Sequence, residues 1–323
     1  MYADEVLAES TLKAYWKCIG TAGSTAADSS GAGLDMTIHS SGVGLNVTPG
    51  VLASGPSFSL DGVAGHARRV LPASFKLASV ALEAWIVMSD PVHSAALGYV
   101  LALMPGGSYS SGKGIIVDYL GASDVFSVLK GTNDGSYNRL SSVTAHNTPG
   151  ELLHIVGWYK GDAGMRLYVN NVLEAINGDS DGDGGPINWA DLPAGPDGGM
   201  AYIGAGRDTT PGTEGNVQFF KLACIGHCAV YASAQNVDPL PAARIAAHYE
   251  AGLTDFLHEL EIAGTLPGLV GSMTMEATPP VHELAIAGIL PALVGSMAIG
   301  FVPPAGGGGP ASIGDITNIT GIS

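Results

Sequence analysis

Positively charged residues are scarce in this chain of 323 residues. Lys and Arg together number 13 against 29 Asp and Glu, which gives a formal net charge of -16. Proteins that bind nucleic acid need clustered Lys and Arg to neutralise phosphates, so we expect no nucleic-acid partner. Charged residues make up only 13% of the chain and its mean hydropathy is positive, which excludes the composition of a disordered protein.

Cysteine is rarer still, with Cys18, Cys224 and Cys228 as its only occurrences. An odd count at these spacings implies no disulfide framework. His227 lies beside Cys228, but a closed zinc site needs four ligands, so we interpret the cysteines as small buried side chains. On a regular strand Cys224 and Cys228 share one face and His227 points to the other.

We also expect neither a targeting segment nor a membrane-spanning segment in this sequence. The first ten residues contain neither the basic nor the apolar part of a signal peptide. The uncharged run at residues 284–302 approaches the roughly 20 residues of a membrane span. It nevertheless contains three glycines and a proline, and the related segment upstream carries Glu261 and Glu276. We therefore expect strands there and no membrane span.

No catalytic motif is present. Retaining glucanases with β-sandwich folds place paired carboxylates on one strand as Glu-x-Asp-x-x-Glu, about 5 Å apart. Glu83 and Asp118 each stand alone in their segments, and there is no Gly-x-Ser-x-Gly motif, P-loop or dinucleotide-binding fingerprint. We expect a protein that is not an enzyme.

Glycine, by contrast, is abundant, with 47 residues, and short apolar segments alternate with Gly-rich turns. Residues 80–87 alternate with apolar groups on both faces, which predicts a strand of a sheet that is covered on both sides, with Trp85 in the core, like Trp16. This pattern is typical of an antiparallel β-sandwich. Further strands are predicted at residues 11–20, 98–103, 114–119, 125–130, 154–160, 165–170, 200–203 and 218–230, with a hairpin turn at residues 161–164 and one short helix at residues 241–251.

Seven segments follow one another along the chain: residues 12–20 (LKAYWKCIG), 26–35 (AADSSGAGLD), 57–62 (SFSLDG), 82–87 (LEAWIV), 151–175, 202–206 (YIGAG) and 229–253. Taken in this order, they resemble the laminin-G-like branch of the concanavalin A-like lectin/glucanase sandwiches found in bacterial and phage surface proteins. The resemblance implies an all-β jelly-roll sandwich over residues 1–253, usually a non-catalytic module for ligand binding or packing and sometimes with one calcium ion. Cys18 departs from the family, where Leu is more common.

An acidic loop provides the candidate metal site. Asp179, Asp181 and Asp183 match the first half of a calcium-binding loop, in which alternate carboxylates converge on one cation. Ala190 stands where the motif has its bidentate Glu. The loop is therefore interpreted either as a Ca²⁺ site or as a solvated acidic loop. We interpret Asp28 as the residue of an Asx-turn that holds its loop.

Aromatic residues provide the candidate ligand site. Sugar-binding sandwiches stack exposed aromatic rings on the apolar faces of sugar rings. The candidates are Trp189, which lies in a loop rich in Gly, Pro and Asp, together with Trp158 and Tyr168. Trp158 and its neighbour Tyr159 point to opposite faces of a strand, so only one of them faces the core.

The C-terminal part of the chain repeats itself. Residues 258–280 recur at residues 282–304, and 15 of 23 aligned positions are identical. A unit this short cannot bury its own apolar face, so we expect residues 254–304 to form a β-repeat stem that associates with sister chains, preferably as a trimer. Residues 305–323 follow as a Gly-rich joint and a C-terminal strand. The predicted oligomerisation residues are Leu260, Ile262, Met273, Leu284, Ile286 and Met297.

The tail is similar to repeats at the C-termini of actinobacteriophage minor tail proteins and other virion proteins. This resemblance implies a structural protein of the phage tail, whose lectin-like domain binds a host surface glycan or packs in the tail beside other virion proteins. Two alternatives remain, a capsid decoration or head fibre protein and a secreted carbohydrate-binding module.

Overall fold

The computed structural model describes residues 2–19, 25–39, 42–48, 50–52, 56–72, 78–89, 97–104, 114–131, 137–161, 163–177, 199–207, 217–235, 237–259, 274–276 and 285–287. It divides into two units, and each is described by itself. The first unit contains the described residues up to Glu259, and the second contains a pair of short antiparallel strands, β19 (Thr274–Glu276) and β20 (Ala285–Ala287).

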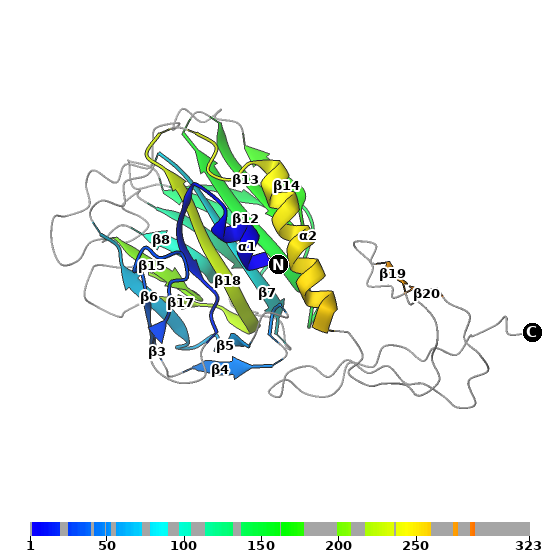
Figure 1. Ribbon diagram of the computed structural model, residues 1–323. Helices are drawn as coiled ribbons and strands as arrows, with labels where there is room; N and C mark the ends of the chain where they lie inside the picture. Colours follow the sequence, from blue (N-terminus) through cyan, green and yellow to red (C-terminus); the bar gives the residue numbers. More distant parts are fainter. Residues whose placement is uncertain are drawn as a thin grey trace, which may run out of the picture. The chain divides into compact units, whose positions relative to one another are not determined.

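Two antiparallel sheets form the first unit (Figure 1). Sheet A has the order β14-β13-β12-β7-β18-β5-β4, with β1 paired to β18, and sheet B has the order β11-β10-β9-β8-β15-β6-β3-β2. The predicted β-sandwich is therefore confirmed. The strands of sheet A are β1 (Leu12–Trp16), β4 (Val43–Val47), β5 (Ser57–Asp61), β7 (Ser79–Met88), β12 (Leu152–Lys160), β13 (Gly164–Val169), β14 (Val172–Asn177) and β18 (Lys221–Ser233). Those of sheet B are β2 (Thr25–Ala26), β3 (Met36–His39), β6 (His66–Val70), β8 (Gly98–Met104), β9 (Ile115–Leu120), β10 (Val125–Gly131), β11 (Tyr137–Ser141) and β15 (Met200–Ile203), and β16 (Ala205–Arg207) pairs separately with β17 (Val217–Phe219).

The main core lies between the sheets, where alternate residues of each strand point inward. Leu82, Ala84 and Ile86 of β7 contribute to it from sheet A, and Val117 of β9 contributes from sheet B. Trp16 is fully buried in this core, as predicted, and its indole N–H donates to the carbonyl oxygen of Leu34 at 2.8 Å. The period-2 pattern of the sequence thus gives the strands their inward faces.

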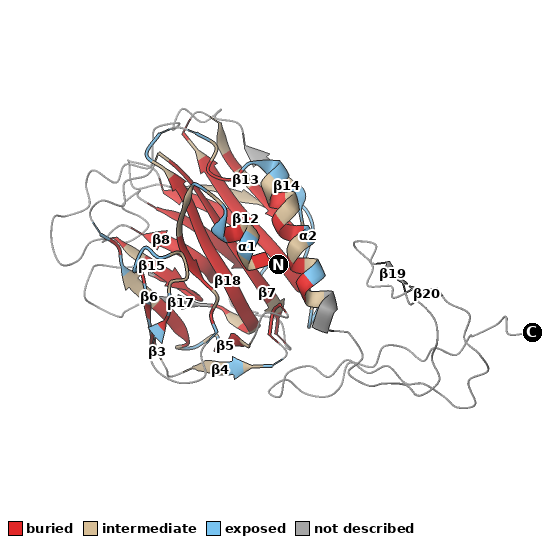
Figure 2. Cartoon of the chain, in the orientation of Figure 1, coloured by how far each residue is buried: buried red, intermediate tan, exposed pale blue. Residues whose placement is uncertain are grey.

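A second apolar cluster covers the outer face of sheet A. There Ala81 and Trp85 of β7 pack with side chains of two helices, α1 (Tyr2–Leu7) and α2 (Ala242–Glu259). Figure 2 shows β7 buried along nearly its whole length. The prediction of a strand covered on both sides is confirmed, and so is the core position of Trp85. The predicted C-terminal helix is present but runs eight residues further, to Glu259.

Among the described residues, no helix combines the length and the apolar character needed to cross a membrane.

The predicted strands all fall on strands of the structure, and the last of them spans both β17 and β18. The hairpin is also confirmed, because Lys160 pairs with Gly164 across it. Eight short strands were not predicted, namely β2, β3, β4, β5, β6, β11, β14 and β16. Many of them lie in segments rich in Gly and Ser, where no long alternation marks a strand.

The loop of Asp28 has the predicted role. Its Oδ1 atom accepts hydrogen bonds from the backbone N–H groups of Tyr15 and Ser30, and its Oδ2 atom accepts one from Leu34. Burial alone would raise the pKa of Asp28, but these hydrogen bonds outweigh it and hold the pKa below its usual value.

One expectation about β18 is wrong. Cys224 packs in the outer cluster and Cys228 in the main core, so the two do not share a face. The pairing of β18 with β7 shifts register between Gly226 and Ala229, and His227 has a positive φ of 53°. Such a bulge reverses the alternation of the strand. All three cysteines are buried, as predicted, and burial raises the pKa of Cys224 to about 12.

Candidate functional site

Three polar groups of the sandwich are candidates for function, one on the outer face of sheet A and two on that of sheet B. On sheet A the region centres on Glu83 of β7, whose side chain is fully buried. Its carboxylate lies 2.6 Å from Nε2 of His154 and 3.1 Å from Nδ1 of His248, and it accepts a hydrogen bond from the hydroxyl of Tyr231. Two strands and helix α2 thus supply its partners.

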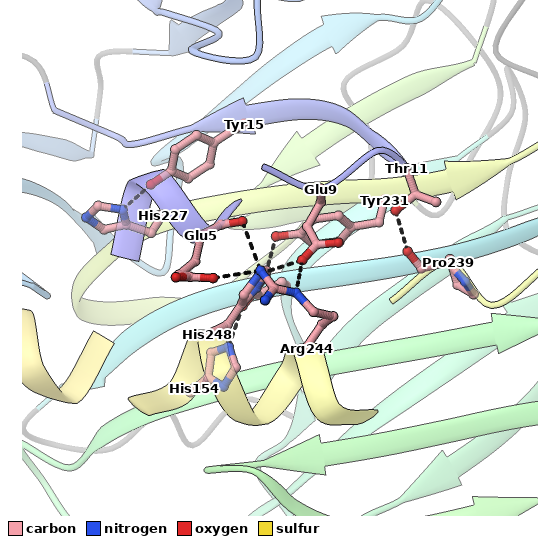
Figure 3. A network of polar contacts seen from close by, with 11 residues as sticks. Glu5, Glu9, Thr11, Tyr15, His154, His227, Tyr231, Pro239, Arg244 and His248 are labelled. Carbon is pink, nitrogen blue, oxygen red and sulfur yellow. Dashed lines mark hydrogen bonds and ion pairs between the residues drawn. The ribbon is translucent and has the colours of Figure 1, made fainter. Parts of the chain in front are cut away.

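The network continues through His248 and Arg244 of α2 to Glu9 and to Glu5 of α1 (Figure 3). Nε2 of His248 lies 3.3 Å from Oε1 of Glu9. Arg244 donates to Glu9 and, at 2.7 Å, to Oε2 of Glu5. Charged side chains therefore link both helices to the sheet.

The charges in this network compensate one another. Burial would raise the pKa of Glu83, but the charge of His248 and hydrogen bonds from His154 and His248 hold it far below its usual range. Burial would likewise lower the pKa of His248, but Glu83 and then Glu9 raise it. A protonated His248 that donates from both ring nitrogens to two carboxylates fits this geometry. The network holds the helices on sheet A.

On sheet B, one polar group centres on Asp118 of β9. Its carboxylate is fully buried, accepts a hydrogen bond from the Ser127 hydroxyl and lies 3.0 Å from the guanidinium of Arg139. Burial raises the pKa of Asp118 to about 6, although Arg139 and Ser127 oppose the shift. Arg139 is committed to this carboxylate, so the group is internally paired.

A second group lies on neighbouring strands at the other end of sheet B. Tyr202 of β15 pairs with Arg68 of β6, Arg68 pairs with Thr37 of β3, and Thr37 pairs with Thr25 of β2. The four side chains therefore form one row across the sheet. His39 and His66 form the next row, with ring centroids 4.1 Å apart and ring planes within 9° of parallel. We call these six residues the basic strip.

The basic strip faces away from the core because its neighbours in sequence face inward. Met36 and Ile38 of β3, Ala67 of β6, and Ala201 and Ile203 of β15 all belong to the main core. Alternation then places the strip residues on the outer face. Thr25 and Thr37 are exposed, Arg68 and His39 are half-buried, and Tyr202 and His66 are buried. The strip therefore combines exposed hydroxyls on β2 and β3 with buried rings on β6 and β15.

Two of the predicted ligand residues are buried on sheet A. Trp158 is 1% exposed, its indole N–H donates to Oδ1 of Asp238 at 2.8 Å, and the guanidinium of Arg166 lies over its ring. Tyr168 is 6% exposed in the same outer cluster. Tyr159 faces the main core, so the opposite directions of Trp158 and Tyr159 are confirmed. A sugar would stack on Trp158 only if the groups around the ring moved away.

The other predicted site residues lie outside the described residues, and the predictions made for them stay predictions. They are the metal candidates Asp179, Asp181 and Asp183, the ligand candidate Trp189, and the oligomerisation candidates Leu260, Ile262, Met273, Leu284 and Met297; the backbone of Ile286 lies in β20. Among the residues that the structure describes, no three His, Cys, Asp or Glu side chains are grouped so as to hold a metal ion.

Sequence reasoning did not find the basic strip. Its residues come from four strands, three of which were not predicted, and no motif joins them. The only signal is that Thr37, His39, His66 and Arg68 alternate with apolar residues in two short segments, residues 36–39 and 66–70.

No family model matches the chain, and no curated protein matches it. The fold is similar to that of the ligand-binding domain of botulinum neurotoxin serotype D in complex with N-acetylneuraminic acid, with a TM-score of 0.50 and 11% identity over 78% of this chain and 53% of that chain. A point mutant of a protein named HCR/D matches with a TM-score of 0.50 and 13% identity, over 75% of this chain and 52% of that one. The receptor-binding domain of botulinum neurotoxin D has a TM-score of 0.49 at 13% identity, with the same coverage. The chain spans about half the length of these structures, and at such identity the likeness shows the sandwich fold alone.

Proposed function

We propose that the chain is a non-catalytic structural protein of a virion, a phage minor tail protein whose sandwich binds a glycan on the host surface. The observation that carries this proposal is the difference between the two outer faces. Helices close the face of sheet A over a network that satisfies its own charges. On sheet B a third apolar cluster that includes Tyr202 covers part of the outer face, and beside it the hydroxyls of Thr25 and Thr37 are exposed on adjacent strands, next to the half-buried Arg68. A few polar groups that converge in this way suit a hydroxyl-rich ligand.

The similar structures support the binding role by analogy of fold. One of them is described as a ligand-binding domain in complex with N-acetylneuraminic acid, and another as a receptor-binding domain. In the proposed assembly, the repeats that follow helix α2, from residue 260 to residue 304, join the chains as a homo-oligomer beside other tail proteins. Several copies of a weak glycan site then bind one surface together, which raises the apparent affinity.

The test is a glycan array that contains bacterial surface glycans, both neutral and acidic, probed with the labelled full-length chain. We expect saturable binding to a small subset of the glycans, and no binding after heat denaturation. If no glycan binds, the sandwich has a packing role in the particle and the glycan-binding proposal is wrong.

A further inference from the structure

We propose that His248 is a proton-dependent switch that holds the N-terminal segment, residues 2–9, on helix α2 and releases it when the imidazole loses its proton. This segment consists of α1 and the two residues that follow it. The switch would change the conformation of the sandwich whether or not the sandwich binds a glycan.

His248 lies between two carboxylates that come from different parts of the fold. Its Nδ1 atom is 3.1 Å from both carboxylate oxygens of Glu83 on β7, and its Nε2 atom is 3.3 Å from Oε1 of Glu9 in the N-terminal segment. An ionised carboxylate only accepts hydrogen bonds, and an imidazole donates from both ring nitrogens only when it is protonated. The protonated ring therefore links the segment to sheet A, and the neutral ring can form only one of the two bonds.

The bond to Glu9 is the one that a neutral ring would lose. His248 and Glu83 are both fully buried, whereas the side chain of Glu9 is 11% exposed and can turn toward water. The bond to Glu9 is also the longer of the two. Without its proton, Nε2 presents a lone pair to the Glu9 carboxylate, and like partial charges at this distance repel each other.

The charged and titratable groups around His248 determine the pH range of the switch. They come from every element packed against the ring, namely Glu83 on β7, His154 on β12, Tyr231 on β18, Tyr2 on α1, Glu9 after α1, and Arg244 on α2 itself. Burial favours the neutral ring, but Glu83 and then Glu9 outweigh burial and Arg244, so the pKa of His248 is raised above 6.5. The stabilisation from the protonated ring is thus fully present below 6.5 and is lost as the pH rises through the raised value.

The remaining contacts of the N-terminal segment do not depend on pH in this range. The amide of Tyr2 donates to Asp255 at 2.8 Å, and Tyr2 packs in the outer cluster. Arg244 also pairs with Glu5 and Glu9, but its side chain is 35% exposed, so solvent screens these pairs (Figure 3). A helix of six residues is too short to be stable by itself, so the segment depends on such contacts. Losing one charge-assisted hydrogen bond should therefore raise the fraction of molecules in which the segment is open.

Hydrogen exchange of the full-length chain, followed by mass spectrometry, measures this opening. The reporters are the amides of Ala8 and Glu9, which donate to the carbonyl oxygens of Asp4 and Val6. After correction for the intrinsic pH dependence of exchange, we expect the opening equilibrium constant to rise about tenfold or more between about pH 6 and about pH 9, as the loss of a charge-assisted hydrogen bond requires. Peptides from β9 and β10 of sheet B should show no such rise.

Two variants test the assignment to His248. His248→Gln removes the titrating group, so the segment should open more often than in the wild type at about pH 6, and the opening should change less than about twofold with pH. Glu9→Gln changes a residue at the edge of the network and tests the switch even if His248→Gln does not fold. The amide of Gln can donate to a neutral imidazole, so the rise should fall below about threefold.

His146→Gln is the matched control. His146 is also a buried histidine with a ring nitrogen 3.2 Å from a carboxylate oxygen, that of Glu151, but it belongs to neither helix. Its variant should keep the wild-type pH profile. The proposal is wrong if opening in the wild type does not change with pH, or if sheet B opens to the same extent. It is also wrong if Glu9→Gln and every folded His248→Gln sample keep the wild-type profile, or if His146→Gln loses it.

Discussion

Glu83 is a fully buried carboxylate that keeps its charge because its neighbours donate to it. An unpaired carboxylate in such a position would take up a proton instead. Its partners His154 and His248 lie 71 and 165 residues away in the sequence. The sequence predicts the strand of Glu83 from alternation alone, but pairings over such distances depend on the fold. For this reason the sequence alone shows Glu83 as an isolated carboxylate.

Glu83→Gln should lower the free energy of unfolding by about 3–5 kcal/mol at pH 5.5, because it leaves a buried His248 without its main counter-charge. The pKa of Glu83 is lowered in the folded state, so its contribution is present above its usual value of 4.5 and is lost as the pH falls. The pKa of His248 is raised, so its contribution is present below 6.5 and is lost as the pH rises. The difference between wild type and variant, measured by urea denaturation, should therefore peak between about pH 4.5 and 6.5.

Glu151→Gln is the control for this prediction. It removes a carboxylate that lies 3.2 Å from a histidine nitrogen, that of His146, but its own side chain is 22% exposed. A solvent-screened pair of this kind contributes at most about 1 kcal/mol. Equal effects of the two substitutions, or a Glu83→Gln effect that does not change with pH, would contradict the role given to Glu83.

Helix α2 is longer than its sequence predicts, because packing extends it beyond a residue that usually ends a helix. The prediction ended the helix at residue 251, directly before Gly252, a residue type that often ends helices. In the structure the helix continues, because Gly252 has no Cβ and lies against the ring of Trp85. The packing of Gly252 against Trp85 outweighs the low intrinsic helix propensity of glycine. The pattern of apolar residues in the helix does not reveal that the helix packs against a residue of β7.

Gly252→Ala tests this contact. In an ordinary helix interior the change stabilises by about 1 kcal/mol. Here a Cβ at residue 252 would overlap the indole of Trp85, so we expect a net loss of about 1–2 kcal/mol in thermal or urea unfolding. Adding Trp85→Phe removes the overlapping atoms, so Gly252→Ala should cost less in that background. A stabilised Gly252→Ala single variant would show that the helix is not held against Trp85.

At the scale of the molecule, the sequence predicts the sandwich because apolar alternation over many short segments leaves little choice of architecture. It does not predict which strands are neighbours, and the basic strip depends on that order. Thr25, Thr37, Arg68 and Tyr202 share a row only because β2, β3, β6 and β15 are adjacent in sheet B. Short strands such as β2 and β3 carry too little pattern to be recognised, and therefore the strip was missed.

Two truncations of the chain test whether the chains associate through the repeats. We expect the full-length chain to be a stable oligomer in light scattering, and a chain that ends at Glu259 to be a monomer with an unchanged melting temperature. A cut after Leu253 should behave differently. It removes Asp255, whose carboxylate accepts the backbone N–H of Tyr2 at 2.8 Å, and Phe256, which packs on the outer cluster.

The shorter chain should lose about 2 kcal/mol of stability, because a hydrogen bond and part of an apolar contact disappear together. For a domain of this size the melting temperature would fall by roughly 4–8 °C. The two cuts therefore separate association from folding, since only the cut after Leu253 removes part of the α1–α2 contact. A monomeric full-length chain, or an oligomer that persists after the cut at Glu259, would place the association elsewhere and remove the support that the tail gives to a virion role.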